Sequence, residues 1–271
     1  MLIEIQHRTT YRYAGPANYS VQCLRLTPPS FDGQEVLNWQ IKAPGIEHAS
    51  SFQDGFGNTA HLASCAMPHD AIVIEATGLI GTVDRYGIAR GLPDPSPVRA
   101  FLRETPRTAP DAAIIDLAHR AERRTTLDTL HWLMAAVREA VSYEIGVTHA
   151  HTTASEALSD GKGVCQDHAH VFISAARALG VPARYVNGYF LSGTLAPAEA
   201  HHAWAEAWVD GLGWVGFDPA NGTCPTERYV RLACGLDALS AAPIRGTQRG
   251  GTEEALDVTV EVQQQSAQHQ Q

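Results

Sequence analysis

The strongest constraint on the fold is a cysteine at the start of an apolar helical pattern, in the segment 161–188, which reads GKGVCQDHAHVFISAARALGVPARYVNG. The Gly-Lys-Gly run before Cys165 predicts a loop with little Cβ obstruction, so the thiol can stand in the open. Apolar residues then recur at helical spacing, at Ala169, Phe172, Ile173, Ala176 and Leu179. Because Gly180 and Pro182 end this pattern, we predict a buried helix with Cys165 in its first turn.

Short strands are predicted after this helix. Their ranges are 184–191, 202–209 and 214–218. The Asp210-Gly211 pair, with Gly213, predicts a tight connection between the second strand and the third. A helix backed by an antiparallel sheet would place His202 and Asp218 on neighbouring strands opposite the Cys165 thiol.

These three side chains are a thiol, an imidazole and a carboxylate in the order Cys165, His202, Asp218. The thiolate is the reactive form of cysteine, and a helix N-terminus beside a protonated imidazole stabilises that anion. The backbone N–H of Cys165 would be a first donor to an oxyanion, because early helical N–H groups lack internal partners. The pattern indicates a cysteine acyl-transfer enzyme. A second oxyanion donor cannot be identified, since Trp132 lies within an amphipathic helical pattern that favours packing.

Several separated segments resemble one family. The segments GVCQDHAH, ARYVNGY, HHAWAEAWVDGLGWVGFDPANG and the later RYV are similar to the bacterial branch of the transglutaminase-like superfamily, whose members are often described as cysteine proteases. The N-terminal strand-rich region and the segment APIRGTQRGGTEEALDVTVEV resemble that branch too. The resemblance implies an α+β fold, in which a β-sandwich-like N-terminal domain precedes a papain-like or transglutaminase-like core.

The same resemblance assigns roles to the three residues. It implies that Cys165 is the nucleophile, that His202 is the general base and then the acid, and that Asp218 holds the imidazole tautomer. His202 is preferred to the adjacent His201 because the family reads His-Ala-Trp at this point.

Cys165 has two alternative uses. A lone cysteine on an alanine-rich helix is usually a packing residue. A zinc site with His168 and His170 is the other alternative, but the chain has no CxxC pair and no HExxH motif. We expect no metal and no cofactor, and we expect His170 to be hydrogen-bonded inside the core.

The chain divides into regions by its hydrophobic pattern and its prolines. Alternation near the N-terminus predicts half-buried strands, and five prolines between Pro93 and Pro110 predict a connection without regular structure. Helices are expected from Asp111, with a capping box at Thr153-Ala-Ser-Glu156, and a late strand at 255–262 is expected to return to the N-terminal sheet. The predicted regions are 1–90 (β-rich), 91–110 (connection), 111–240 (catalytic), 241–263 (return segment with a strand) and 264–271 (disordered tail).

Composition excludes some classes of partner. A chain of 271 residues with 44% hydrophobic content can bury a sizeable core, and a net charge of −9 without a Lys/Arg run argues against nucleic acid binding. The start, MLIEIQHRTTYRY, lacks the pattern of a signal peptide, and no apolar run reaches membrane-spanning length. We therefore expect a cytoplasmic protein with five free cysteines and no membrane partner. The sequence does not indicate an oligomeric state.

Three functions fit the sequence. The first is hydrolysis of a peptide, isopeptide or other amide bond through a Cys165 thioester. The second is transglutamination, in which an amine replaces water and the acyl donor is a glutamine side chain. The third is a binding module that retains the fold without catalysis. Cys165, His202 and Asp218 would serve the first two equally, because the choice depends on whether the cleft admits an amine or water.

Overall fold

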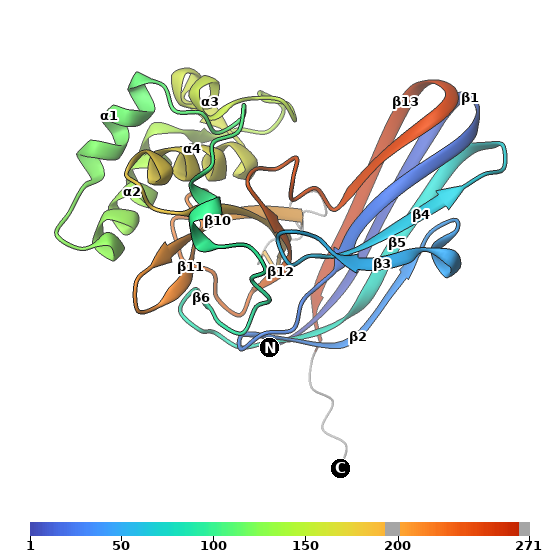
Figure 1. Cartoon of the computed structure of the whole chain (residues 1–271), viewed down its shortest axis with the longest axis horizontal. Coiled ribbons are helices and arrows are strands. Elements are labelled where there is room, and N and C mark those ends of the chain that lie inside the picture. The colour runs from blue at the N-terminus through green and yellow to red at the C-terminus, as the bar shows by residue number, and fades with distance from the viewer. Residues whose placement is uncertain (193–200, 266–271) are drawn as a thin grey trace, which may run out of the picture.

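Two antiparallel sheets and a group of helices make up the part of the chain that the computed structural model describes, residues 1–192 and 201–265 (Figure 1). One sheet is formed by the N-terminal strands together with the last strand. The other sheet, in which all strands except one follow the helices in the sequence, lies between the helices and the N-terminal sheet. The fold is therefore α+β, as the sequence predicts.

The N-terminal sheet is built around its first strand. Its strands are β1 (Leu2–Thr27), β2 (Gln34–Lys42), β3 (Ser50–Gln53), β4 (Thr59–Cys65), β5 (His69–Thr82) and β13 (Ile244–Gln264). β4 and β5 both pair with β1, one with each half of its length, and β3 and β2 pair with their outer sides. A 3-10 turn, η1 (Ile46–His48), precedes β3.

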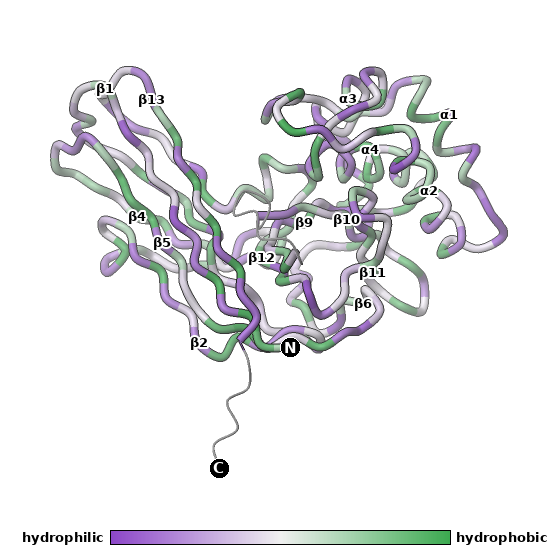
Figure 2. Tube along the Cα trace, turned by 180° about the vertical axis from the view of Figure 1, so that it is seen from behind, coloured by the Kyte–Doolittle hydropathy of each residue, from purple (hydrophilic) through white to green (hydrophobic). Residues whose placement is uncertain are grey.

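The inner face of this sheet packs on the second sheet. Hydrophobic and hydrophilic residues alternate along its strands (Figure 2), and the buried set includes Ile3, Ile5 and Leu24. The same buried cluster contains Tyr189 and Val230, which belong to the second sheet. A β-sandwich-like region was predicted within residues 1–90; strands β1 to β5 form a single sheet with β13, and the layer packed on it is the second sheet.

The last strand returns to the first. β13 runs antiparallel to β1 from the pair Ile3–Gln264 to the pair Leu24–Ile244, so it is much longer than the strand predicted at 255–262. Val260 is buried, while Leu256 and Val258 remain about half exposed, at 57% and 47%. Gln264, the first residue of the predicted tail, belongs to this strand, and 266–271 lie outside the described residues.

The molecule has two lobes, the N-terminal sheet and the helices with the second sheet, and the connection between them contains short regular elements. β6 (Ile88–Ala89) pairs with the second sheet, and the 3-10 turn η2 (Val98–Leu102) follows Pro97. The prediction of no regular structure before Asp111 is therefore wrong at η2. Proline fits this position because its fixed φ suits a turn entrance, and Phe101 anchors the turn by packing edge-on against Trp214 at 5.0 Å.

The helices are α1 (Ala112–Ala121), α2 (Thr126–Ala140), α3 (Ala154–Asp160) and α4 (Cys165–Ala178). Asp111 caps α1 by accepting a hydrogen bond from Ile114 N, and the predicted capping box of Thr153 and Glu156 opens α3. No helix within 1–192 and 201–265 is both long and apolar enough to cross a membrane.

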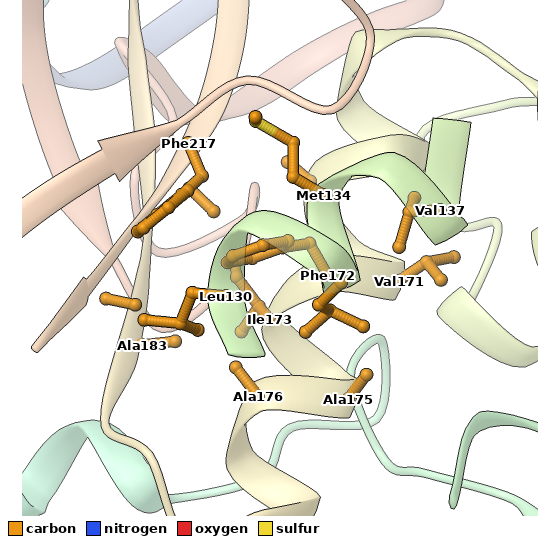
Figure 3. Packing of buried hydrophobic residues seen from close by; sticks show 14 of the residues in the cluster. Leu130, Met134, Val137, Val171, Phe172, Ile173, Ala175, Ala176, Ala183 and Phe217 are labelled. Atoms are coloured by element: carbon orange, nitrogen blue, oxygen red, sulfur yellow. The ribbon is translucent and has the colours of Figure 1, made fainter. Parts of the chain in front are cut away.

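The helices surround α4 and cover one face of the second sheet. The strands of this sheet are β6, β9 (Ala183–Phe190), β10 (His201–Val209), β11 (Gly213–Phe217) and β12 (Tyr229–Gly235), in the order β12-β9-β10-β11-β6. A small parallel pair, β7 (Ser142–Tyr143) and β8 (Lys162–Gly163), precedes α4. Phe172 of α4 stacks on Phe217 of β11 with ring centroids 5.2 Å apart, in contact with Leu130 and Met134 of α2 (Figure 3).

The other face of the sheet buries an ion cluster. Glu206 of β10 accepts hydrogen bonds from Arg184 Nε of β9 at 2.6 Å and from Arg231 Nε of β12 at 3.0 Å. Arg184 also donates to Asp94 of the connection at 2.7 Å. The cluster joins three neighbouring strands of the sheet to the chain segment that links the two lobes.

Candidate active site

Cys165 is the first residue of α4, and the backbone before it is shaped by glycine. Gly161 has a φ of 67° at the end of α3, and a Cβ on Gly163 would lie 2.7 Å from the side chain of Asp167. The Asp167 carboxylate accepts hydrogen bonds from Val164 N at 2.8 Å and from Thr148 Oγ1 at 2.6 Å. These contacts fix the start of the helix, so the prediction of Cys165 in the first helical turn is confirmed.

His202 and Asp218 meet at the end of the sheet. His202 is the second residue of β10, and Asp218 directly follows β11. The His202 Nε2 and Asp218 Oδ2 atoms are 2.7 Å apart, and both side chains are buried. The register places Phe217 opposite Ala205, so β11 ends before it reaches His202.

The Cys165 thiol lies near enough to the His202 imidazole to affect its pKa. Because Asp218 Oδ2 lies at Nε2, the nitrogen left for the thiol is Nδ1. Burial lowers the pKa of His202, but the hydrogen bonds and charges of Asp218 and Cys165 outweigh it and raise the pKa to about 10. The structure thus brings the three predicted residues together, with an imidazole that favours its protonated form beside a thiol.

Asp218 accepts hydrogen bonds on both oxygens. Oδ1 accepts from the backbone N–H groups of Ala220 and Asn221, at 3.1 and 3.2 Å. Oδ2 accepts from Asn221 Nδ2 and from the Tyr229 hydroxyl, each at 2.7 Å, in addition to His202. Burial raises the pKa of Asp218, but these hydrogen bonds and the His202 charge lower it overall.

Asn221 and Tyr229 were not predicted as site residues. Both lie in segments that carried the family resemblance, FDPANG and RYV, but the pattern gave neither a role. The signal for Asn221 is its spacing, because an asparagine three residues after an aspartate can close a turn around it. No comparable local signal marks Tyr229.

Aromatic rings enclose the imidazole. The ring centroids of Phe190, Trp204 and Tyr229 lie 5.4, 6.4 and 5.9 Å from that of His202. Trp204 is 2% exposed, and the surface it packs against includes His202. The enclosure removes water from the His202–Asp218 pair and strengthens its electrostatic interaction.

His201 lies apart from this group. Its ring is 5.8 Å from that of His7 and 6.2 Å from that of Tyr189, at a cavity of about 370 Å³ between the two lobes. Burial, together with the neighbouring His202 charge, lowers the pKa of His201 to about 4. His201 is therefore neutral near pH 7, and Asp218 contacts His202 instead.

The histidines of α4 are held by the backbone. The two ring nitrogens of His168 lie 2.9 and 2.8 Å from the carbonyl oxygens of Val164 and Val141. His170 is fully buried, and its Nε2 accepts a hydrogen bond from Ala238 N at 3.1 Å, as predicted for a core histidine. Within 1–192 and 201–265, no three His, Cys, Asp or Glu side chains are grouped to hold a metal ion.

Trp132, considered as a second oxyanion donor, lies on the outside of α2. It is 55% exposed, and the Arg123 guanidinium is 4.1 Å from the centre of its ring. Packing in the core or on the helix surface was expected, and the structure shows the helix surface.

Comparison with known families agrees with this architecture. Residues 115–219 match the transglutaminase-like superfamily, and residues 3–81 match the bacterial transglutaminase-like N-terminal region. The two matches cover α1 to Asp218 and most of the N-terminal sheet. The chain belongs to the transglutaminase-like superfamily and carries the bacterial N-terminal region of that family.

Individual relatives align over nearly the whole chain. The uncharacterized protein ML0607 of Mycobacterium leprae is 27% identical over 279 residues, which cover 96% of this chain and 98% of that protein. The uncharacterized protein Rv2569c of Mycobacterium tuberculosis is 27% identical over 95% of this chain and 91% of its own. Among solved structures, a "putative cysteine protease" from Cytophaga hutchinsonii has a TM-score of 0.76 and 23% identity, over 97% of this chain and 90% of that one. This likeness shows a shared fold.

Proposed function

We propose that the protein is a thiol-dependent acyl-transfer enzyme, a cysteine peptidase or amidase that cleaves peptide, isopeptide or other amide bonds. The observation that carries the proposal is the buried His202–Asp218 pair, 2.7 Å apart, with the Cys165 thiol near enough to raise the pKa of His202. This is the nucleophile, base and orienting acid arrangement that recurs in acyl transfer on unrelated folds.

The proposed reaction begins with the Cys165 thiolate and the His202 imidazolium. Sulfur attacks the carbonyl carbon, the carbonyl electrons move to oxygen, and a tetrahedral oxyanion forms. The C–N bond then breaks while His202 Nδ1–H gives its proton to the leaving amine, which leaves a thioester on Cys165. His202 next takes a proton from water, whose oxygen attacks the thioester, and the acid product departs as the thiolate is restored.

The start of α4 would stabilise the oxyanion. The N–H of Cys165 is among the first of the helix and has no partner within it. The helix N-terminus also carries a partial positive charge, which favours negative charge on both the sulfur and the oxyanion.

Transfer to an amine is the alternative outcome of the same thioester. A primary amine, such as a lysine side chain, would then attack in place of water, and the acyl donor would be a glutamine side chain. His202 and Asp218 would act in the same way, so the acceptor alone separates a transglutaminase from a hydrolase.

Mass spectrometry of peptide products tests the proposal. The full-length protein is incubated with a library of glutamine-containing peptides, with and without a primary amine, beside the Cys165→Ser variant. Cleavage or deamidation that depends on Cys165 supports hydrolysis, and a mass gain equal to the amine minus ammonia supports transglutamination. A binding module would be supported instead by two results together. The spectra would be identical for both proteins, and iodoacetamide would alkylate Cys165 no faster than the other four cysteines.

A further inference from the structure

We propose that Tyr229 is a positioning residue of this acyl transfer, whose hydroxyl holds the Asp218 carboxylate in its ionised form against His202. The inference rests on the proposed function, and it assigns a role to a residue that two strands of the sheet separate from Asp218. Tyr229 begins β12, whereas Asp218 follows β11, and β9 and β10 lie between them.

The contact is direct in spite of this separation. The Tyr229 hydroxyl is 2.7 Å from Asp218 Oδ2, the same oxygen that His202 Nε2 contacts at 2.7 Å. The tyrosine side chain reaches this oxygen by crossing the face of the sheet beside His202 and Trp204, with ring centroids 5.9 and 5.5 Å away. A tyrosine is long enough to span this distance and still place a polar atom at the end.

The direction of the hydrogen bond is fixed. Burial and the charge of Asp218 raise the pKa of Tyr229, so its hydroxyl keeps its proton. An ionised carboxylate offers only acceptors, and Tyr229 must therefore donate to Asp218. Asn221 Nδ2 lies 3.4 Å from the hydroxyl oxygen and can donate to it, so the hydroxyl links Asn221 to Asp218.

The ring and the hydroxyl have separable effects. The ring packs 4.6 Å from that of Phe190 and edge-on to Trp204, which is ordinary packing for an aromatic residue in a sheet. Phenylalanine would keep these contacts and remove only the donor. The hydroxyl lowers the pKa of Asp218, so its loss should let the carboxyl group accept a proton at higher pH.

A neutral Asp218 would no longer stabilise the His202 imidazolium, and the thiolate beside it would lose its counterion. We therefore expect Tyr229→Phe to lower the alkylation rate of Cys165 by about tenfold at mildly acidic pH, the effect of one hydrogen bond to a charged group. The acid limb of the rate profile should move to higher pH by about one unit. Once a substrate is known, kcat should fall while KM stays unchanged, because Tyr229 would not touch the substrate.

The experiment measures alkylation of Cys165 by iodoacetamide across the acid and neutral range, using the full chain and peptide mass spectrometry. Tyr189→Phe is the matched control, because its buried hydroxyl hydrogen-bonds to a histidine outside the site, His7 Nδ1, at 2.8 Å. That variant should keep the wild-type profile. A Tyr229→Phe profile that also coincides with the wild type would overturn the inference.

A second variant covers the case in which Tyr229→Phe does not fold. A tyrosine fluorinated beside the hydroxyl, incorporated at position 229, keeps the ring and makes the hydroxyl a stronger donor. It should move the acid limb to lower pH, and an unchanged profile would again refute the role. If wild-type Cys165 itself is no more reactive than the other cysteines, the proposed function fails, which is a different result from an unshifted profile on a reactive thiol.

Discussion

Replacement of Asp218 by asparagine gives a sharp test of the site, because every recorded hydrogen-bond partner of this carboxylate is a donor. Two backbone N–H groups point at Oδ1, and His202, Asn221 Nδ2 and Tyr229 point at Oδ2. An amide has one acceptor oxygen and one NH₂ group. Either orientation of the introduced amide therefore turns its NH₂ group towards donors.

The two orientations have different costs. With NH₂ at the Oδ1 position, the N–H groups of Ala220 and Asn221 both lose their acceptor. With NH₂ at the Oδ2 position, His202 can change tautomer and accept, and the Tyr229 oxygen can accept from both the NH₂ group and Asn221 Nδ2, which lies 3.4 Å away, so that only the Tyr229 O–H lacks an acceptor. One unsatisfied buried donor costs about 1–3 kcal/mol, so the second orientation should be favoured and the variant should fold.

The favoured orientation damages the chemistry more than the fold. His202 would accept at Nε2 and carry its proton on Nδ1, the nitrogen that faces Cys165, where it can no longer take the thiol proton. The imidazolium would also lack an acceptor at Nε2. We expect the alkylation rate of Cys165 at pH 7 to fall about 30-fold, to that of an ordinary thiol with a pKa of about 8.5, while turnover of an amide substrate should fall by up to about 10⁴-fold, as the same change does in chymotrypsin-like serine proteases.

Asp54→Asn is a matched control for this substitution. Asp54 Oδ1 also accepts from two backbone N–H groups, of Phe56 and Asn58, and its Oδ2 accepts from Asn58 Nδ2 and Arg25 Nε. Urea unfolding should show losses of stability in both variants, while only Asp218→Asn should lose thiol reactivity. If Asp218→Asn kept more than about a tenth of the wild-type rate, the tautomer argument would be refuted.

Three further outcomes are expected. His202→Ala should remove the enhanced alkylation of Cys165 while His201→Ala should leave most of it, and the reverse result in the same labelling assay would reassign the base. Glu206→Gln should cost about 3–5 kcal/mol at neutral pH in urea unfolding, because it leaves two buried arginines short of their carboxylate. Burial raises the pKa of Glu206, but the two arginines outweigh it and lower the pKa to about 2. This stabilisation is therefore present above the unfolded pKa of 4.5 and is lost as pH falls towards 2. A difference in unfolding free energy between wild type and variant that stayed constant over that range would contradict the reasoning. Removal of residues 244–271 should lower the melting temperature and promote association, because β1 would lose its partner along most of its length, and an equally stable monomer in calorimetry and gel filtration would contradict this.

Local sequence patterns were sufficient to predict the helix and the strands that hold the candidate site residues. The helix at Cys165 and the strands at His202 and before Asp218 begin within one residue of their predicted positions, because helical and strand periodicities were both clear. The pairing of His202 with Asp218 depends on strand register. Both faces of these strands are buried, so register is set by which residues pack against the helices and by the short Asp210-Gly211 connection, which is visible in the sequence.

The extent of the N-terminal sheet was harder to predict. Gly15 and Pro16 normally mark the end of a strand, but β1 continues through them to Thr27. The register with β13 shifts between Ala14 and Ala17, so the irregular residues are accommodated as a bulge. The long partner strand, which comes from the other end of the chain, supplies the pairing on both sides of the bulge, and no local pattern contains that information.

Tyr229 and Glu206 show why the remaining polar contacts could not be predicted. On β12, Tyr229 alternates with buried apolar residues as any packing aromatic would, and Glu206 interrupts the apolar part of β10 without a charged neighbour there. Their partners, Asp218 for Tyr229 and the two arginines for Glu206, come from other strands, and the strand order β12-β9-β10-β11 differs from the chain order. A buried polar side chain must find a partner, so the sequence can indicate that one exists. The identity of that partner follows only from the assembled sheet. For Tyr229, the assembly places its hydroxyl as a donor to Asp218 Oδ2, the oxygen that orients His202, the candidate base.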